Sequence, residues 1–336
     1  MLPSNAYWPV LLCTLFAWAC LDIPRLPSDP TADDRSWQEA GSSRPSTFDA
    51  GDASSAPPPP LRVGSWNVRR LGSHEDTDVT LLAKLIERHF DMVALVEVMH
   101  TGQGTHHGLD ALALALGPGW STRATATPRP NLDAPFAEFY AVLFRTSLLA
   151  SCDQDVHLGY VSDADGRSDS AQTTDQFLRE PAFGCFRAHD ASGAASFDFA
   201  LGVYHARWGT GQVADIAAEV VHLDGTMEEV TRRLPGEQDV ILLGDFNLTP
   251  DELAPLVHAE DATQGSGSTL SSSGSRSERL LDHMLIVHPA HTSERLEPAR
   301  VLDLRAEAGS ALEYYRHVSD HLPIAALFDV QGADDD

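Results

Sequence analysis

Residues 240–247 have the sequence Val-Ile-Leu-Leu-Gly-Asp-Phe-Asn, in which four apolar residues precede a glycine and two polar side chains. A short apolar run without alternation is typical of a strand that is covered on both faces. Asp245 and Asn247 then follow at the end of this strand, where packing requires neither a carboxylate nor an amide. The stretch therefore predicts a buried strand that presents polar side chains at one edge of a sheet.

The same arrangement recurs along the chain. Apolar runs predict further strands at 61–68, 92–98, 139–144, 197–205, 283–287 and 323–330. Polar side chains stand at or beside the ends of most of these strands, and they are Asn67, Arg69, Glu97, His205, Asp282, Asp320 and His321. This repetition indicates a common site built from several strand ends.

Helical and loop segments separate the strands. Val79, Leu82 and Ile86 share one face of an amphipathic segment, and residues 213–234 form a second helix that Pro235 and Gly236 should end. The segments 153–179 and 261–279 are polar and predict loops. Strands mixed with helices indicate an α/β layered sandwich.

The polar residues suggest chemistry when they are taken together. Any one of them has a structural explanation, such as a turn asparagine or a hydrogen-bonded core histidine. Four acids beside apolar strands, however, would each be costly to bury without a partner. A hard divalent cation with oxygen ligands supplies the missing charge, and carboxylates beside histidines supply acid–base pairs. The residues predict a metal-dependent hydrolase.

The ends of the chain predict export. Residues 10–19 form an apolar run too short to span a bilayer, and Ala17-Trp18-Ala19 resembles a signal-peptide cleavage site, so 1–19 is expected to be a signal peptide. Cys20 is a candidate lipid anchor. Residues 20–60 are rich in Pro, Ser and Asp and predict a disordered tether, and 331–336 form an acidic tail. A bacterial protein that is secreted, periplasmic or lipid-anchored at the cell surface fits these features.

Cysteine usage agrees with an oxidising compartment. Cys152 and Cys185 are the two cysteines of the expected folded unit, 61–330, and form one possible disulfide. Two unpaired core cysteines are the alternative.

The 336-residue chain carries 49 acidic and 23 basic side chains, which gives a formal net charge of −26. Its hydrophobic content of 43% excludes a wholly disordered chain. The acidity argues against a nucleic-acid partner, because phosphates require positive potential. Bound divalent cations would reverse the local field at the site, so the net charge does not exclude a nuclease.

The quoted residues resemble the endonuclease/exonuclease/phosphatase superfamily over essentially all of 61–330. The resemblance rests on a set of short motifs in this order: Trp66-Asn67-Val68-Arg69, Glu97-Val98, Tyr204-His205, Gly244-Asp245-Phe246-Asn247, Leu281-Asp282-His283 and Ser319-Asp320-His321. It implies a four-layer αββα sandwich, with two mixed β-sheets packed face to face and helices outside.

Two further segments look like the pancreatic-type deoxyribonuclease branch. They are Glu138-Phe139-Tyr140 and Asp175–Pro181. The resemblance implies that Glu138 orients His205. It also implies phosphate contacts by Arg69 and Arg179, a sugar contact by Phe136 in the minor groove, and one structural Ca²⁺ held by Asp165, Asp175 and Glu180. Arg207 is a further candidate for a local positive track along the DNA.

The chain also departs from that branch. Met99 stands where the branch has an arginine that reaches into the minor groove, and His283 replaces a basic residue. Residues 266–277 lack the acids of a second calcium loop, so one calcium is expected.

The resemblance implies hydrolysis of a phosphodiester by in-line attack of water. Asp282 would orient His321 as general base, and His205 would be the general acid. Mg²⁺ or Mn²⁺ would be held by Glu97 with Asn67, Asp245 and Asp320, while Asn247 and Arg179 donate to the phosphoryl oxygens.

A monomeric DNA endonuclease with little sequence preference and no stable protein partner is the leading hypothesis. The alternatives are the same chemistry on sphingomyelin, inositol phosphates or nucleotides, and a non-catalytic surface binding module.

Overall fold

The computed structural model describes residues 59–101, 106–130, 137–152, 157–161, 176–190, 193–208, 213–234, 236–287 and 292–331. The expected signal peptide, nearly all of the tether and all but the first residue of the acidic tail lie outside these ranges. No helix among the described residues is long and apolar enough to cross a membrane.

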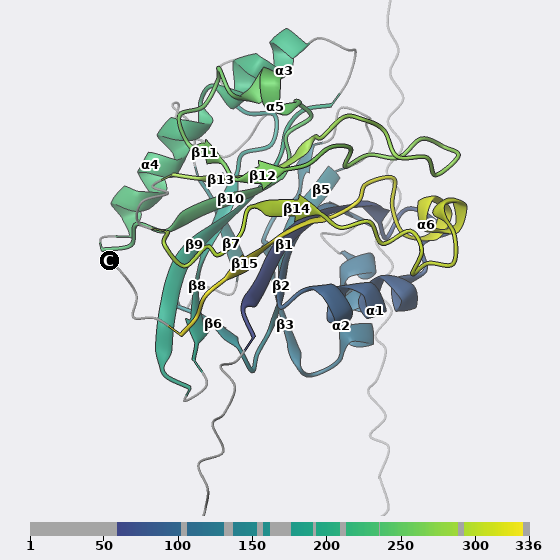
Figure 1. The fold of residues 1–336 in the computed structure, drawn as a ribbon, viewed down its shortest axis with the longest axis horizontal. Helices are drawn as coiled ribbons and strands as arrows, with labels where there is room; N and C mark the ends of the chain where they lie inside the picture. Colours follow the sequence, from purple (N-terminus) through teal and green to yellow (C-terminus); the bar gives the residue numbers. More distant parts are fainter. Residues whose placement is uncertain are drawn as a thin grey trace, which may run out of the picture. The chain divides into compact units, whose positions relative to one another are not determined.

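The strands form two mixed sheets (Figure 1). The first sheet contains, in spatial order, β3 (Trp120–Thr125), β5 (Ala137–Arg145), β2 (Met92–Met99), β1 (Leu61–Leu71), β15 (Ile324–Phe328), β14 (Ala299–Val301) and β12 (Thr263–Gln264), with β4 (Arg129–Pro130) beside β5. The second contains β11 (Glu260–Asp261), β13 (Asp282–Ile286), β10 (Val240–Asp245), β9 (Ala195–His205) and β8 (Ala182–His189), with β6 (Leu149–Ser151) beside β8. The short β7 (His157–Tyr160) pairs with both β3 and β8 and so joins the two sheets at one edge.

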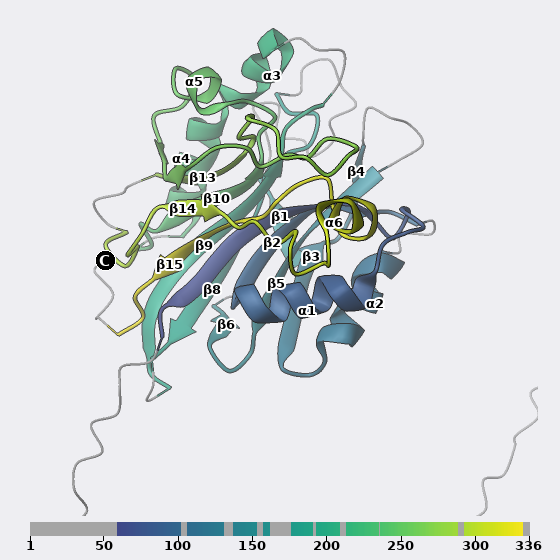
Figure 2. The same ribbon diagram turned by 45° about the vertical axis from the view of Figure 1, so that its right-hand side comes forward.

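Helices cover the outer faces of both sheets (Figures 1 and 2). On the first sheet these are α1 (Val79–His89), α2 (His107–Leu116) and α6 (Ala311–His317), and on the second they are α3 (Val213–Val220), α4 (Leu223–Arg233) and α5 (Pro250–Leu253). A third apolar cluster lies between the sheets and contains residues of both, such as Val142 and Ile241. The fold is therefore the four-layer αββα sandwich that the sequence predicted.

Alternation along the strands explains their continuous apolar runs. In β10, Ile241 and Leu243 point to the core between the sheets, whereas Val240 and Leu242 pack beneath the helices. Successive side chains of a strand point to opposite faces, and both faces are covered here. The four residues from Val240 to Leu243 must therefore be apolar.

The predicted helix over 213–234 is wrong as a single helix. The chain forms α3 and α4 with a break at Val221 and His222, where the amide of His222 donates to Glu219 O in a tightened turn. The break lets Glu219 stay buried on α3 while Leu223 and Met227 of α4 pack on the second sheet. The strand expected at 323–330 is shorter, and β8, α2 and α6 were not predicted.

Cys152 and Cys185 form a disulfide, which confirms the pair that the cysteine arithmetic suggested. Cys185 lies in β8, and Cys152 directly follows β6, its partner strand. The bond therefore fastens an edge of the second sheet.

Candidate active site

The predicted polar residues meet at one end of the sandwich. The pairs β1–β2 and β9–β10 are parallel, so their carboxyl ends lie together at that end. A cavity of about 410 Å³ opens there. Its walls are formed by Arg69, Arg70, His74, Glu97, His205, Trp208, Asp245, Asn247, Thr269, Leu281, Asp320 and His321.

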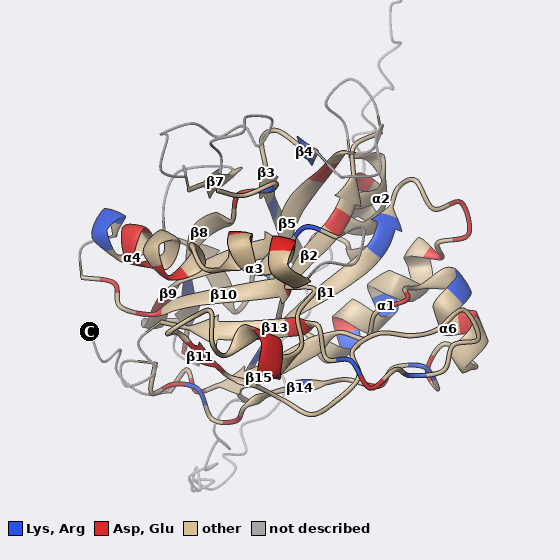
Figure 3. Ribbon diagram, turned by 90° about the horizontal axis from the view of Figure 1, so that it is seen from above, with Lys and Arg blue, Asp and Glu red and all other residues tan. Residues whose placement is uncertain are grey.

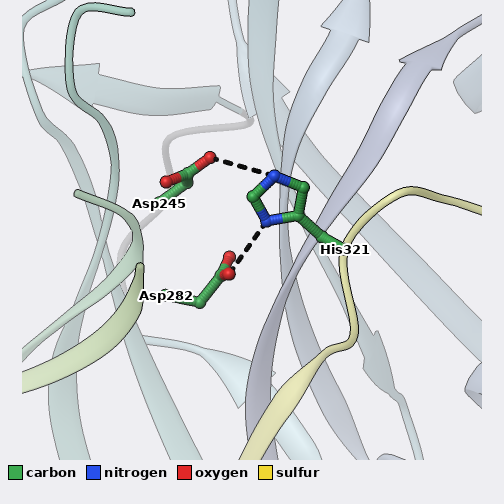
Figure 4. A group of neighbouring side chains, drawn as sticks. All are labelled: Asp245, Asp282 and His321. Carbon is green, nitrogen blue, oxygen red and sulfur yellow. Dashed lines mark hydrogen bonds and ion pairs between the residues drawn. The ribbon is translucent and has the colours of Figure 1, made fainter. Parts of the chain in front are cut away.

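His321 is held between two carboxylates (Figure 4). Its Nδ1 donates to Asp282 Oδ2 at 2.9 Å, and its Nε2 lies 3.6 Å from Asp245 Oδ2. Burial alone would lower the pKa of His321, but Asp282 and Asp245 outweigh it and raise that pKa well above its usual value. His321 is thereby fixed in one orientation, with Nε2 directed at Asp245.

His205 occupies a matching position at the end of β9. Its Nδ1 donates to Glu138 Oε1 at 2.8 Å, and its Nε2 lies 3.8 Å from the same oxygen of Asp245. Burial opposes the charged ring, but Glu138 outweighs this effect and raises the pKa of His205. The backbone amide of His205 also donates to the Tyr140 hydroxyl, which fixes the main chain at this position.

Asp245 therefore stands between two histidines, each oriented by its own carboxylate. Burial would raise the pKa of Asp245, but His321 and His205 outweigh it and lower that pKa. Because the Nδ1 atom of each ring is engaged, only Nε2 remains to exchange a proton. The arrangement can accept a proton at one ring and donate one at the other.

Glu97 provides a further carboxylate on the cavity wall. It accepts from Asn67 Nδ2 at 3.0 Å and from the backbone amide of Arg70, and the same Asn67 nitrogen donates to Asp245 at 3.1 Å. Burial is the main cause that raises the pKa of Glu97. Close carboxylates joined through one amide form a donor set of hard oxygens that fits a divalent cation.

A second set of possible ligands overlaps this one. Asp245, Asp282 and His321 offer ligand atoms that all lie within 4.8 Å of one another. The Nδ1 of His321 is already engaged by Asp282, so this trio also fits the acid–base role. Asp320 lines the cavity too, but its carboxylate lies 3.7 Å from Arg69 Nε.

The backbone is strained at this site. Arg69, Arg70, Glu97 and Asn247 are the four non-glycine residues with positive φ among those the structure describes, at 45°, 54°, 60° and 53°. The pairing of β1 with β2 shifts between Asn67 and Leu71, and that of β2 with β5 shifts between Leu95 and Val98. Such bulges re-aim side chains, and here they surround the cavity with two arginines and an acid.

Gly244 of the Gly-Asp-Phe-Asn motif is required by packing. A Cβ at this position, where φ is +153°, would lie 1.7 Å from the carbonyl oxygen of Tyr204. Only glycine lets β10 approach β9 so closely, and this approach brings Asp245 to His205. Asn247 is fixed by its amide, which donates to Ala206 O at 3.2 Å.

Arg69 lines the cavity, but Arg179 does not. The Arg179 side chain is fully buried, with Nε 2.8 Å from Glu138 Oε1 and further bonds to the carbonyls of His205 and Ala206. In this structure Arg179 therefore contacts Glu138 and two backbone carbonyls and does not reach the cavity where a phosphate contact was expected. Arg179 instead neutralises Glu138 from behind the histidine.

Other expected binding residues are engaged elsewhere. Arg207 does not line the cavity and donates to Glu219 at 2.9 Å. Glu180 is buried against Arg129 at 2.5 Å, so it meets an arginine where a calcium ion was expected. Phe136, Asp165 and Asp175 lie outside the described residues.

Sequence reasoning missed several residues of the site. Arg70 directly follows the Trp-Asn-Val-Arg motif and Trp208 lies three residues after His205, so their proximity to motifs was the available signal. Ser319 was quoted without a role, yet its hydroxyl donates to Asn67 O at 2.6 Å and accepts from the His321 amide. The buried Glu219 gave no signal, because it stands in an amphipathic helix like many acids.

The fold and this constellation of residues agree with comparisons to known proteins. Residues 64–321 match the Endonuclease/Exonuclease/phosphatase family, and the chain belongs to that family. The protein is thus a hydrolase of a family whose members generally use divalent metals.

Individual relatives agree with this assignment. A deoxyribonuclease of Thioalkalivibrio sp. (strain K90mix) is 30% identical over 282 residues, which cover 80% of this chain and 71% of the relative. A solved family member from Bacteroides thetaiotaomicron superposes with a TM-score of 0.57 at 17% identity, covering 82% of this chain and 97% of that one. A mannosyl-6-phosphatase from the same species superposes with a TM-score of 0.54 at 18% identity, covering 80% of this chain and 100% of that one. At such low identities these two structures support the fold alone.

Proposed function

We propose that this protein is an exported, divalent-metal-dependent endonuclease that hydrolyses DNA phosphodiester bonds with little sequence preference. The observation that carries the proposal is the pair of oriented histidines, whose Nε2 atoms face the same oxygen of Asp245 at 3.8 and 3.6 Å. Two rings aimed at one point suit a reaction that removes a proton on one side of a phosphorus and supplies one on the other. The deoxyribonuclease relative favours DNA as the substrate.

His321 acts as the general base in this proposal. Its neutral Nε2 accepts a proton from the attacking water, and Asp282 stabilises the imidazolium that forms. His205 is the general acid, since Glu138 keeps its ring charged and oriented until it protonates the leaving oxygen. The in-line geometry requires the phosphate to lie between the two rings.

Cations surround the place where phosphate charge develops. Arg69, Arg70 and Asn247 all line the cavity. Glu97, Asn67, Asp245 and Asp320 would hold Mg²⁺ or Mn²⁺, which would neutralise these acids and stabilise negative charge on the phosphoryl oxygens. A structural Ca²⁺ held by Asp165, Asp175 and Glu180 is also part of the proposal, with Glu180 contacting Arg129 in this structure.

Export is supported by the apolar run at 10–19 and by the Cys152–Cys185 disulfide. Lipid attachment at Cys20 is one form that export would take. Metabolic labelling with a fatty-acid analogue in the native host, compared between wild type and Cys20→Ser, separates the lipid-anchored from the freely secreted protein.

The function is tested with the purified protein and its His321→Ala variant. Supercoiled plasmid, RNA and sphingomyelin vesicles are each incubated with Mg²⁺, with Mg²⁺ plus Ca²⁺, and with chelator. We expect plasmid nicking that chelator abolishes and that His321→Ala lowers by about 10²-fold or more. Phosphocholine release without nicking, or nicking that survives chelation, would refute the proposal.

A further inference from the structure

Trp208 is an exposed aromatic residue on the wall of the active-site cavity. It is 57% exposed, the largest hydrophobic side chain among the exposed ones that the structure describes. It lies three residues after His205 and lines the same cavity as that ring and as Arg69 and Arg70. Among the residues that the structure describes, the apolar clusters beneath the helices and between the sheets do not contain Trp208, so packing in those clusters does not account for it.

The charges around Trp208 indicate what it would contact. Arg69 is held in place by its stack on Tyr315, 4.3 Å from the ring centre, and Arg70 lines the same cavity beside the register shift between β1 and β2. Figure 3 views the protein from the side where β1 ends in a blue segment, with red segments on neighbouring strands. The cavity is lined by two arginines, by several acidic side chains and by an exposed indole. This combination suits a phosphate that carries a flat aromatic group.

We propose that Trp208 is a stacking platform for an unpaired nucleotide base, and that the preferred substrate is single-stranded or locally unpaired DNA. This inference rests on the proposed nuclease function and adds the substrate class. In a duplex both faces of a base are occupied by its neighbours, so an indole can stack only on a base that has left the helix. The cavity volume of about 410 Å³ leaves room for roughly one nucleotide.

The position of Trp208 also indicates which side of the scissile phosphodiester bond it would contact. His205 faces the leaving oxygen in the proposed reaction, and Trp208 follows it closely in the chain. Because both residues line the same cavity, we expect Trp208 to contact the nucleotide that carries the leaving group. Stacking would also compensate for the acidic body of the protein, whose net charge of −26 weakens attraction to phosphates.

The test compares one labelled oligonucleotide as a single strand and annealed to its complement. Wild type, Trp208→Ala, Trp208→Phe and Leu114→Ala are assayed with Mg²⁺ plus Ca²⁺. Leu114 is 83% exposed on α2 and is a matched control for loss of an exposed apolar side chain. Thermal unfolding checks that all four fold.

We expect wild type to prefer the single strand. Trp208→Ala should lower kcat/KM on the single strand by about 5- to 150-fold, mainly through KM, because base–aromatic stacking is of this size. Activity on the duplex should change by less than about 2-fold. Trp208→Phe should retain most of the single-strand activity, and Leu114→Ala should match wild type.

A binding measurement adds a readout that does not depend on turnover. In the inactive His321→Ala background, a single strand should quench tryptophan emission, and the added Trp208→Phe change should remove the quenching. If wild type and Trp208→Ala cleave the single strand with equal activity, the stacking role is overturned. The nuclease assignment then stands, because DNA is still cleaved. Absence of any DNA cleavage by wild type overturns the nuclease assignment itself, as does a Trp208-dependent release of phosphocholine from sphingomyelin vesicles.

Discussion

Asp245 is the residue at which the two halves of the site meet. It accepts from Asn67 at the end of β1 and lies within 4 Å of both histidine Nε2 atoms. A buried carboxylate is tolerated there because several donors and two imidazoles surround it. One oxygen thus lies between the rings of His205 and His321, the proposed general acid and general base.

The pKa of His321 gives a prediction for Asp282→Asn. His321 must be neutral to accept a proton, so activity is lost as pH falls through its pKa. Burial lowers this pKa, and Asp282 is the largest cause that raises it. The variant should therefore move the acidic limb of the kcat/KM profile to lower pH, while the plateau falls by about 10²-fold or more because the imidazolium loses its partner.

The check is a pH–rate profile of both proteins at fixed metal and salt concentrations. Asp303→Asn, which changes an acid paired with Arg305 away from the cavity, is the control and should leave the profile in place. An acidic limb that stays where it is in Asp282→Asn would contradict the assignment of His321 as the base.

At the scale of the elements, α3 fastens the end of β9. Glu219 is buried on this helix and accepts from the Tyr204 hydroxyl at 2.5 Å, from Arg207 Nε at 2.9 Å and from the Leu178 amide at 3.2 Å. These contacts join α3 to the strand that carries His205 and to the segment that carries Arg179. The helix thus supports the end of β9, which carries His205, from outside the cavity.

Glu219→Ala should lower the free energy of unfolding by about 2–4 kcal/mol, because it leaves buried donors unpaired. Denaturant unfolding measures the change. Glu228→Ala on the exposed face of α4 is the matched control and should stay within about 0.5 kcal/mol of wild type. If the two variants unfolded alike, the supporting role of Glu219 would be wrong.

At the scale of the whole molecule, the disulfide closes a long loop. Cys152 and Cys185 are 33 residues apart, and their bond constrains the unfolded chain. Replacing both by serine should lower the free energy of unfolding by about 3–4 kcal/mol on the chain-entropy model. Calorimetry with and without reductant checks this, and reductant should affect wild type but leave the double variant unchanged.

The net charge also acts on the whole molecule. A chain with a formal net charge of −26 repels DNA at long range. DNA binding should therefore depend on the few arginines at the cavity and on any bound metal. The electrostatic inference from composition therefore concerns affinity, whereas the chemistry depends on where a few carboxylates lie.

The sequence by itself determined the layers and most of the residues that form the candidate site. Continuous apolar runs specify strands covered on both faces, and polar residues at the ends of parallel strands must meet at one edge of a sheet. Glu97, His205, Asp245 and His321 were predictable because they stand beside such runs, out of place in a core.

Only the tertiary structure decided which basic residue each buried carboxylate contacts. Arg179 was expected to contact a phosphate and forms an ion pair with Glu138 in the structure. Glu180 was expected to bind calcium and forms an ion pair with Arg129. Glu219 gave no sequence signal, since an acid on a helix is ordinary, and the signal for Trp208 was only its place three residues after His205. Charge partners are chosen by distances between residues far apart in the chain, and those distances exist only once the two sheets have packed.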